Sequence, residues 1–251
     1  MSLAIDLFCG LGGWSEGLLA EGWDVIGFDI ERHEYGDQKY PAQFVIQDVL
    51  TLHGRQFKDV DLIVASPPCQ EYSYMAMPWS RAKKIRAEYL SGERDRKKLT
   101  ELFDACFRIQ REAKEAAGRH IPIIVENVRG AQEWVGQSQW NFGSFHLWGD
   151  VPALMPIIPR KKFSSFRFNQ SDKYLCDCEN PEPKNGVALV SNECPIHNDN
   201  PYPKSEGIKN GIGRDESYSL TCPKGISRKY ASAMIAKIPL SLSQHIAKVF
   251  K

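Results

Sequence analysis

The feature that most constrains the fold is a series of short apolar runs separated by turns and helical segments. The runs are residues 3–8, 23–30, 42–50, 60–66 and 121–128. Their nearly continuous apolar character is typical of strands that are buried on both faces of a parallel sheet. Before the last run, apolar residues recur at helical spacing between Leu102 and Ala113. This alternation predicts an α/β domain with a parallel sheet covered on both faces.

Chemically active side chains follow these runs where each predicted strand ends. A glycine-rich turn, FCGLGG (8–13), follows the first run, and Asp29 and Asp48 lie near the ends of the second and third. SPPCQ (66–70) follows the fourth run, and Glu126 with Asn127 closes the fifth. Ligands of such sheets bind at the carboxyl ends of the strands. We therefore expect these residues to share one cleft.

The first half of this cleft has the features of a cofactor site. Glycines let the backbone approach a ligand closely, and the helix that follows supplies free N–H groups. Asp29 is placed to accept hydrogen bonds from ribose hydroxyls, and Asp48 from an adenine amino group. The alternative for each aspartate is a helix N-cap. Since the chain has no lysine-bearing phosphate loop, the pattern favours an adenosine-bearing cofactor over a nucleoside triphosphate.

The second half of the cleft pairs Cys69 with Glu126. A thiolate beside a carboxylic acid suits nucleophilic addition to an electron-poor ring with simultaneous protonation. Pro67 and Pro68 fix φ and would hold Cys69 with little conformational freedom. Reactivity requires a lowered thiol pKa, for which we expect a helix N-terminus or neighbouring cations. The alternative is that Cys69 is a small buried apolar residue.

Three ordered motifs resemble those of a known family. FCGLGGWSEGL, SPPCQEYS and ENV are similar to the first, fourth and sixth motifs of the DNA (cytosine-5) methyltransferases, over about residues 3–130. The resemblance implies a Rossmann-like, S-adenosylmethionine-dependent fold with a small loop-rich target-recognition lobe, in a compact bacterial or phage-type member. It implies methylation of carbon 5 of a flipped-out cytosine in double-stranded DNA through a covalent cysteine adduct. Methylation of structured RNA such as tRNA, or a catalytically silent DNA-binding homologue, are the alternatives.

The resemblance also assigns roles to individual residues. Its catalytic set is Cys69, Glu126, Asn127 and Pro68. Its cofactor-binding set is Phe8, Gly10, Leu11, Gly12, Asp29, Ile30, Asp48, Val49, Pro67 and Ser232, with Ile30 as an apolar lid on adenine. The family's eighth motif, a glutamine followed by alternating arginines, has no clear counterpart in NFGSFHLWGD (141–150). The arginine that would contact the base is therefore left open.

A basic segment, residues 78–98, carries eight Lys and Arg against three acidic residues. It begins nine residues after Cys69, so we expect it to cover the same cleft and to contact phosphates of the target strand. The expected DNA contacts are Gln70, Ser73, Arg81, Lys83, Lys84 and Arg129. The alternative is a solvated surface helix.

The domain prediction has three parts. Residues 1–150 form the catalytic and cofactor-binding domain, residues 151–227 a small target-recognition region, and residues 228–251 a segment that returns to the catalytic domain. The middle part contains a C-x-C and a C-x-x-H motif. Its candidate structural zinc ligands are Cys176, Cys178, Cys194 and His197. The alternative is that these are unligated loop residues.

The overall composition indicates the cellular compartment in which we expect the protein to act. No apolar run approaches the roughly 20 residues that span a membrane, and no secretory signal is apparent. Seven dispersed cysteines suit a reducing cytoplasm. A net charge of +1 neither favours nor excludes nucleic acid, because a local basic patch can lie within a neutral total. We expect a cytoplasmic monomer that acts on double-stranded DNA, with a restriction endonuclease as a partner.

Overall fold

The chain divides into two compact units, Met1–Ile158 with Ile226–Lys251, and Pro159–Gly225. The computed structural model describes residues 2–35, 38–70, 72, 79–156, 233 and 236–251. The second unit, which falls within the predicted target-recognition region, lies outside the described residues. So do Ser73, Ser232 and the four expected zinc ligands, Cys176, Cys178, Cys194 and His197. Their roles stay predictions.

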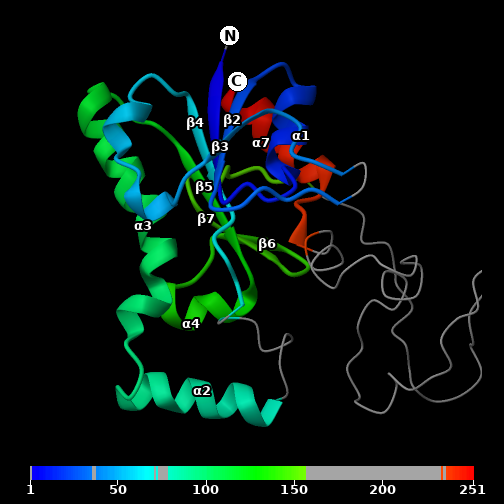
Figure 1. Ribbon diagram of the computed structural model, residues 1–251. Coiled ribbons are helices and arrows are strands. Elements are labelled where there is room, and N and C mark those ends of the chain that lie inside the picture. The colour runs from blue at the N-terminus through cyan, green and yellow to red at the C-terminus, as the bar shows by residue number, and fades with distance from the viewer. Residues whose placement is uncertain (1, 36–37, 71, 73–78, 157–232, 234–235) are drawn as a thin grey trace, which may run out of the picture. The chain divides into compact units, whose positions relative to one another are not determined.

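A seven-stranded sheet with the order β3-β2-β1-β4-β5-β7-β6 forms the centre of the described unit (Figure 1). The strands are β1 (Leu3–Leu7), β2 (Asp24–Asp29), β3 (Gln43–Ile46), β4 (Leu62–Ala65), β5 (Ile123–Asn127), β6 (Trp140–Phe142) and β7 (Phe145–Gly149). β1 to β5 pair in parallel, whereas β7 runs antiparallel to both β5 and β6. The predicted α/β class and the five apolar strands are confirmed.

Helices cover both faces of the sheet, as its two-sided burial requires. α1 (Gly13–Ala20) and α7 (Leu240–Phe250) pack together on one face, and α3 (Arg96–Ala117) lies on the other (Figure 1). The Asp95 carboxylate caps α3 by accepting a hydrogen bond from the Lys97 N–H at 2.9 Å, and Gly118 ends the helix with a φ of 63°. Each face therefore has its own apolar core, one around α3 and one between α1 and α7.

Five further helices lie among the described residues that follow β3, β4 and β5, close in sequence to the predicted site residues. They are η1 (Val49–Thr51), η2 (Gly54–Phe57), α2 (Trp79–Ser91), η4 (Arg129–Ala131) and α4 (Gln132–Val135). α2 is the first part of the predicted basic segment, and it contacts α4 through a 2.5 Å ion pair between Arg86 and Glu133. In the part of the chain that the structure describes, no helix has both the length and the apolar surface needed to cross a bilayer.

Two local features differ from the sequence prediction. The third apolar run, predicted as a strand to residue 50, leaves the sheet after Ile46, because Asp48 caps η1 through a 2.9 Å bond from the Leu50 N–H. The β6–β7 hairpin lies in the stretch compared above with the family's eighth motif, which the sequence analysis did not identify as strands. Gly143, with a φ of 58°, forms its tight turn.

The contact between α1 and α7 leads to a first prediction. A Cβ added at Gly17 in α1 would lie 2.1 Å from Ser243 Oγ and 2.6 Å from the Gln244 backbone nitrogen. We expect Gly17→Ala to lower the free energy of unfolding by about 1–3 kcal/mol, although alanine has the higher helix propensity. Urea denaturation measures the change, and Leu19→Ala on the half-exposed side of α1 is the control. Wild-type stability of Gly17→Ala would contradict the close packing.

Candidate active site

The glycine-rich loop after β1 has a left-handed backbone at Phe8, Gly10 and Gly12, with φ values of 57°, 49° and 78°. Among the described residues, Phe8 is the one non-glycine residue with a positive φ, a conformation that costs on the order of 1 kcal/mol. A Cβ added at Gly12 would lie 2.5 Å from Pro41 Cδ, whereas one at Gly10 would meet nothing within 4 Å. The loop is thus packed at Gly12 and open to a ligand at Gly10.

Asp29, at the end of β2, ties this loop to the neighbouring strand. Its carboxylate accepts hydrogen bonds from the Gly10 N–H at 3.0 Å and from the Ile30 N–H at 2.8 Å. Each carboxylate oxygen keeps a lone pair that can accept a ribose hydroxyl. The Ile30 side chain is 66% exposed, so it is available to cover an adenine ring. The loop, the acid and the apolar lid therefore fit an adenosine-bearing cofactor.

Other residues in the predicted cofactor set have different positions. Asp48 is exposed, and its carboxylate caps η1, so the N-cap alternative is realised at this aspartate. Val49 and Leu11 are buried, with Val49 in the core beneath α3, so neither side chain is available to line an open cleft.

A buried hydrogen-bonded group that the sequence analysis did not single out supports the loop from within. Ser15 Oγ donates to Asp6 Oδ2 at 2.6 Å and lies 2.6 Å from the Tyr40 hydroxyl, which in turn donates to Ser15. Burial raises the pKa of Asp6 to about 8, the nearby Asp29 raises it further, and the Ser15 hydrogen bond opposes the shift. Asp6 is therefore neutral at pH 7. The sequence feature that could have revealed this group is Asp6, an aspartate within the apolar run of residues 3–8.

The Cys69 loop is held at both ends. At its start, Asn127 Nδ2 donates to the Pro67 carbonyl at 3.0 Å, and Asn127 Oδ1 accepts from the Val128 N–H at 2.8 Å. Pro67 is buried, Pro68 is exposed and Cys69 is partly exposed. Because both ends of the Asn127 amide bind backbone, Asn127 holds the start of the Cys69 loop against the end of β5.

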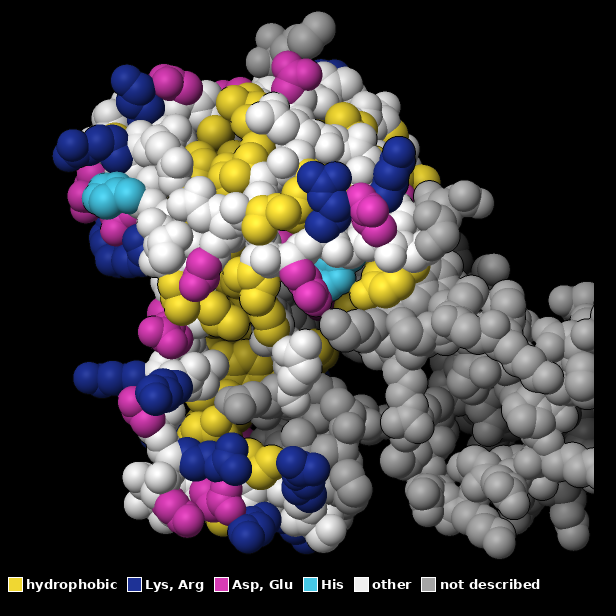
Figure 2. Space-filling model, viewed as in Figure 1, with side chains coloured by type: hydrophobic (Ala, Val, Ile, Leu, Met, Phe, Trp, Pro, Cys, Tyr) yellow, Lys and Arg dark blue, Asp and Glu magenta, His cyan; other side chains and the backbone are white. Residues whose placement is uncertain are grey.

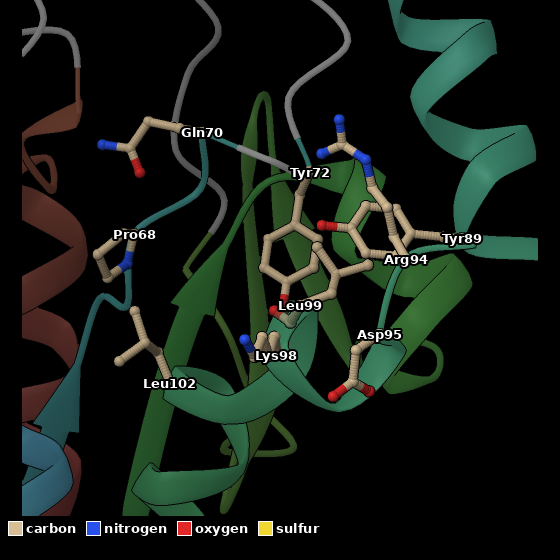
Figure 3. A pocket seen from close by; sticks show the side chains of 9 residues that line it. All are labelled: Pro68, Gln70, Tyr72, Tyr89, Arg94, Asp95, Lys98, Leu99 and Leu102. Atoms are coloured by element: carbon tan, nitrogen blue, oxygen red, sulfur yellow. The ribbon is translucent and has the colours of Figure 1, made fainter. Parts of the chain in front are cut away.

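The other end of the loop is fixed by Tyr72, a residue that the sequence analysis missed. Its N–H donates to the Cys69 carbonyl at 3.0 Å, and its buried hydroxyl donates to the Leu99 carbonyl in α3 at 2.6 Å (Figure 3). Beside it lies a cavity of about 490 Å³. Pro68, Gln70, Tyr72, Tyr89, Arg94, Asp95, Lys98, Leu99 and Leu102 line this cavity. The end of the basic segment thus lines this cavity together with residues that flank Cys69.

The cations of the basic segment fall into two groups. Arg94 pairs with Glu88 at 2.6 Å, and the Arg96 guanidinium lies over the Trp134 ring at 5.4 Å. Arg81, Lys83 and Lys84 lie on the exposed surface of α2, where Lys84 also pairs with Glu88 at 3.9 Å. Figure 2 shows acidic side chains among the basic ones over this helix. The segment combines structural ion pairs with exposed cations, so the solvated-helix interpretation and the DNA-contact interpretation both fit parts of it.

Glu126 is the acid of the site. It is 8% exposed at the end of β5, and burial raises its pKa to about 8 against the opposing effect of a hydrogen bond with Ser66. At pH 7 the carboxyl is therefore protonated and able to donate a hydrogen bond. The exposed Arg129 lies just beyond it in η4. Burial lowers the pKa of His146, and the Arg129 charge lowers it further.

The expectation that the pKa of Cys69 is lowered is wrong for this structure. Burial raises the pKa of the thiol, and the nearby Glu126 carboxyl raises it further. A backbone hydrogen bond at Cys69 opposes this shift, and among the described residues neither a cation nor a helix N-terminus adds to that lowering effect. Formation of the thiolate therefore depends on a neutral Glu126, since a neutral carboxyl removes the repulsion between two negative charges.

The comparison with protein families decides which kind of site this is. Residues 3–134 match the model of the C-5 cytosine-specific DNA methylases. This chain belongs to that family. The match contains the glycine-rich loop, the Cys69 loop and Glu126, so the family assignment rests on the same residues as the geometry.

Individual relatives match shorter parts. The type II methyltransferase M.DdeI of Desulfomicrobium norvegicum is 33% identical over 102 residues, which is 37% of this chain and 20% of M.DdeI. A prophage-encoded DNA modification methyltransferase structure from E. coli is 24% identical with a TM-score of 0.35, covering 54% of this chain and 35% of that one. The Dnmt2 methyltransferase of S. pombe is 18% identical with a TM-score of 0.34, covering 54% and 37%. The chain thus spans about a third or less of these relatives' lengths.

The two buried carboxyls lead to a prediction about pH. The pKa values of Asp6 and Glu126 rise to about 8 in the folded state from model values of 3.8 and 4.5. Because the folded state keeps protons that the unfolded chain has released, both groups make the free energy of unfolding fall as pH rises through this window. We expect a slope of at most about 1.4 kcal/mol per pH unit from each group.

Urea denaturation at several pH values measures this dependence. Glu126→Gln keeps a neutral side chain of the same shape, so its stability should fall less steeply with pH than that of the wild type. An identical slope in the two proteins would show that Glu126 is ionised in the folded state at neutral pH.

Proposed function

We propose that the protein transfers a methyl group to carbon 5 of cytosine in double-stranded DNA. The observation that carries the proposal is the combination of Cys69 with a buried, protonated Glu126 beside an open glycine-rich loop. The family match adds the reaction type, because its model is that of C-5 cytosine-specific DNA methylases.

The cofactor we propose is S-adenosylmethionine, which supplies the methyl group when bound. Phe8, Gly10 and Gly12 would hold it through their backbone, which is set in left-handed conformations with an open face at Gly10. Asp29 would accept hydrogen bonds from the ribose hydroxyls, and the exposed Ile30 would cover the adenine. The protein's contribution here is binding and orientation.

The acid and the nucleophile act together on the base. Cytosine, flipped out of the duplex at a cost of a few kcal/mol, would receive a hydrogen bond on its ring nitrogen from the protonated Glu126. Withdrawal of electrons makes carbon 6 electrophilic. The Cys69 thiol would release its proton to solvent and its sulfur would bond to carbon 6, while the double bond between carbons 5 and 6 is broken and its electron pair makes carbon 5 nucleophilic. Transfer of the methyl group to carbon 5 would leave the cofactor as its neutral thioether. Carbon 5 would then lose its proton to solvent, and the bond between Cys69 and carbon 6 would break, which restores the double bond of the ring and the Cys69 thiolate.

Substrate binding would use the surface around the Cys69 loop. We infer that Arg81, Lys83 and Lys84 contact phosphates, with Gln70 and Arg129 nearer to the target base. Base recognition would come from residues 151–227, and a restriction endonuclease would be the partner in a modification system. The type II methyltransferase relative supports this setting.

A covalent trap tests the nucleophile. In the presence of S-adenosylmethionine, a duplex with 5-fluorocytosine at the target position should form an adduct with the wild type, because fluorine cannot leave as a proton does. Denaturing electrophoresis detects the adduct. We expect none with Cys69→Ala and at least a 100-fold slower rate with Glu126→Gln. An equal yield with Cys69→Ala would exclude Cys69 as the nucleophile.

The nature of the substrate is tested by transfer of a tritiated methyl group. We expect incorporation into duplex DNA and none into tRNA, because the matching family model is that of DNA methylases. Cys69→Ala is the control for both substrates. Incorporation into tRNA alone would support the RNA alternative, and incorporation into neither by a folded wild-type protein would support the silent homologue.

A further inference from the structure

Ser66 occupies a position between the cofactor side of the cleft and the catalytic acid. In the parallel pairing of β4 with β5, Ala65 is opposite Val125, so the residues that follow are Ser66 and Glu126. The Ser66 N–H donates to the Leu7 carbonyl at 3.1 Å, which extends the pairing with β1 and fixes the Ser66 backbone. Residues at paired positions of neighbouring strands share a face, so Ser66 and Glu126 lie side by side on one face, and the Ser66 side chain acts to lower the pKa of Glu126.

Trp14 contacts Ser66 from the helix above this face. Trp14 lies in the first turn of α1, is 2% exposed, and packs in the core that contains Val64 and Ile124. Its indole Nε1–H donates to Ser66 Oγ at 3.0 Å. Since an indole nitrogen can only donate, Ser66 is the acceptor in this bond. The Ser66 hydroxyl proton is thereby left for the Glu126 carboxyl.

We propose that Trp14 and Ser66 are positioning residues that hold the Glu126 carboxyl in its reactive orientation. α1 begins at Gly13, directly after the glycine-rich loop, so the same helix that continues the cofactor loop also fixes the acid. The orientation of Glu126 is thus linked, through its strand neighbour Ser66 and the Trp14–Ser66 hydrogen bond, to the loop that would bind S-adenosylmethionine. The inference rests on the proposed role of Glu126 and adds two residues to which the family motifs assign no role.

Among the groups around Glu126, Ser66 is the one whose removal should change the pKa of the Glu126 carboxyl. Cys69, in the loop after β4, is the titratable group that interacts with Glu126. On α1, Glu16 is paired with Lys237 at 2.5 Å. On β7, His146 is opposite Asn127 and shares the other face of the sheet. The Ser66 hydroxyl is the contact that lowers the pKa of Glu126, so its loss should raise that pKa.

Three variants separate the hydrogen bonds from packing. Ser66→Ala removes the hydroxyl, Ser66→Thr keeps it, and Trp14→Phe removes only the indole donor from an aromatic side chain. Circular dichroism and thermal melting establish that each full-length variant is folded. The first readout is the titration of the Glu126 carboxyl by ¹³C NMR on protein with labelled glutamate, assigned with Glu126→Gln. We expect the midpoint to rise in Ser66→Ala and to stay near the wild-type value in Ser66→Thr.

The second readout is methylation of a cytosine-containing duplex. We expect kcat to fall at least tenfold in Ser66→Ala and by a smaller factor in Trp14→Phe, while KM for DNA and for S-adenosylmethionine changes less than twofold. Ser66→Thr should recover most of the rate. We expect kcat to change more than KM because Trp14 and Ser66 orient the acid and contact neither substrate nor cofactor.

The results that would overturn the positioning role differ from the result that would overturn the proposed function. If the wild type methylates DNA but Ser66→Ala keeps both the wild-type carboxyl midpoint and the wild-type kcat, the positioning role is excluded. Equal impairment of Ser66→Thr and Ser66→Ala would also overturn it, because packing would then be the cause. If Ser66→Ala fails to fold, an unchanged midpoint and rate in Trp14→Phe overturns it. A wild type without methylation activity defeats the proposed function, while the NMR titration still decides whether the chain orients Glu126.

Discussion

The parallel register of β1, β4 and β5 is the constraint on which the rest of the site depends. It aligns the carboxyl ends of the three central strands, so that the glycine-rich loop, the Cys69 loop and Glu126 leave the sheet at the same edge. A slip of one residue in β5 would turn Glu126 to the opposite face and place Asn127 beside Ser66. Burial of both faces of these strands under α1, α7 and α3 makes such a slip costly.

The same burial forces polar groups into a poorly solvated environment, and the structure compensates with short hydrogen-bonded chains. Asp6 is linked to Ser15 and Tyr40, and Glu126 to Ser66 and Trp14. In both chains the hydroxyl of a serine connects an aromatic donor to a carboxyl. Desolvation raises the pKa of each carboxyl to about 8, so each is neutral at pH 7. A neutral Glu126 is the form that can donate a proton to a ring nitrogen.

The position of the Cys69 loop and the pKa of its thiol depend on the fold as well as on the sequence of the loop. Two prolines limit the backbone of this loop, but its position depends on Asn127 at one end and on the Tyr72 hydroxyl at the other. Both contacts join residues that are far apart in the chain, so no local pattern could predict them. The raised pKa of the Cys69 thiol likewise depends on its burial and on its distance from Glu126. Neither can be read from neighbouring residues.

Hydrophobic periodicity and the placement of glycine, cysteine and glutamate at strand ends were enough to predict the fold class and the edge of the sheet at which these residues lie, because both patterns are local. The third strand was predicted too long because the Asp48 cap competes with strand pairing, and the β6–β7 hairpin was missed because its pairing partner, β5, lies outside its own segment. The sequence alone determined which residues lie at the carboxyl edge of the sheet and which family they resemble. Only the tertiary structure decided which of them are charged, which hold others in place and which are buried, since these depend on desolvation and on contacts between distant segments.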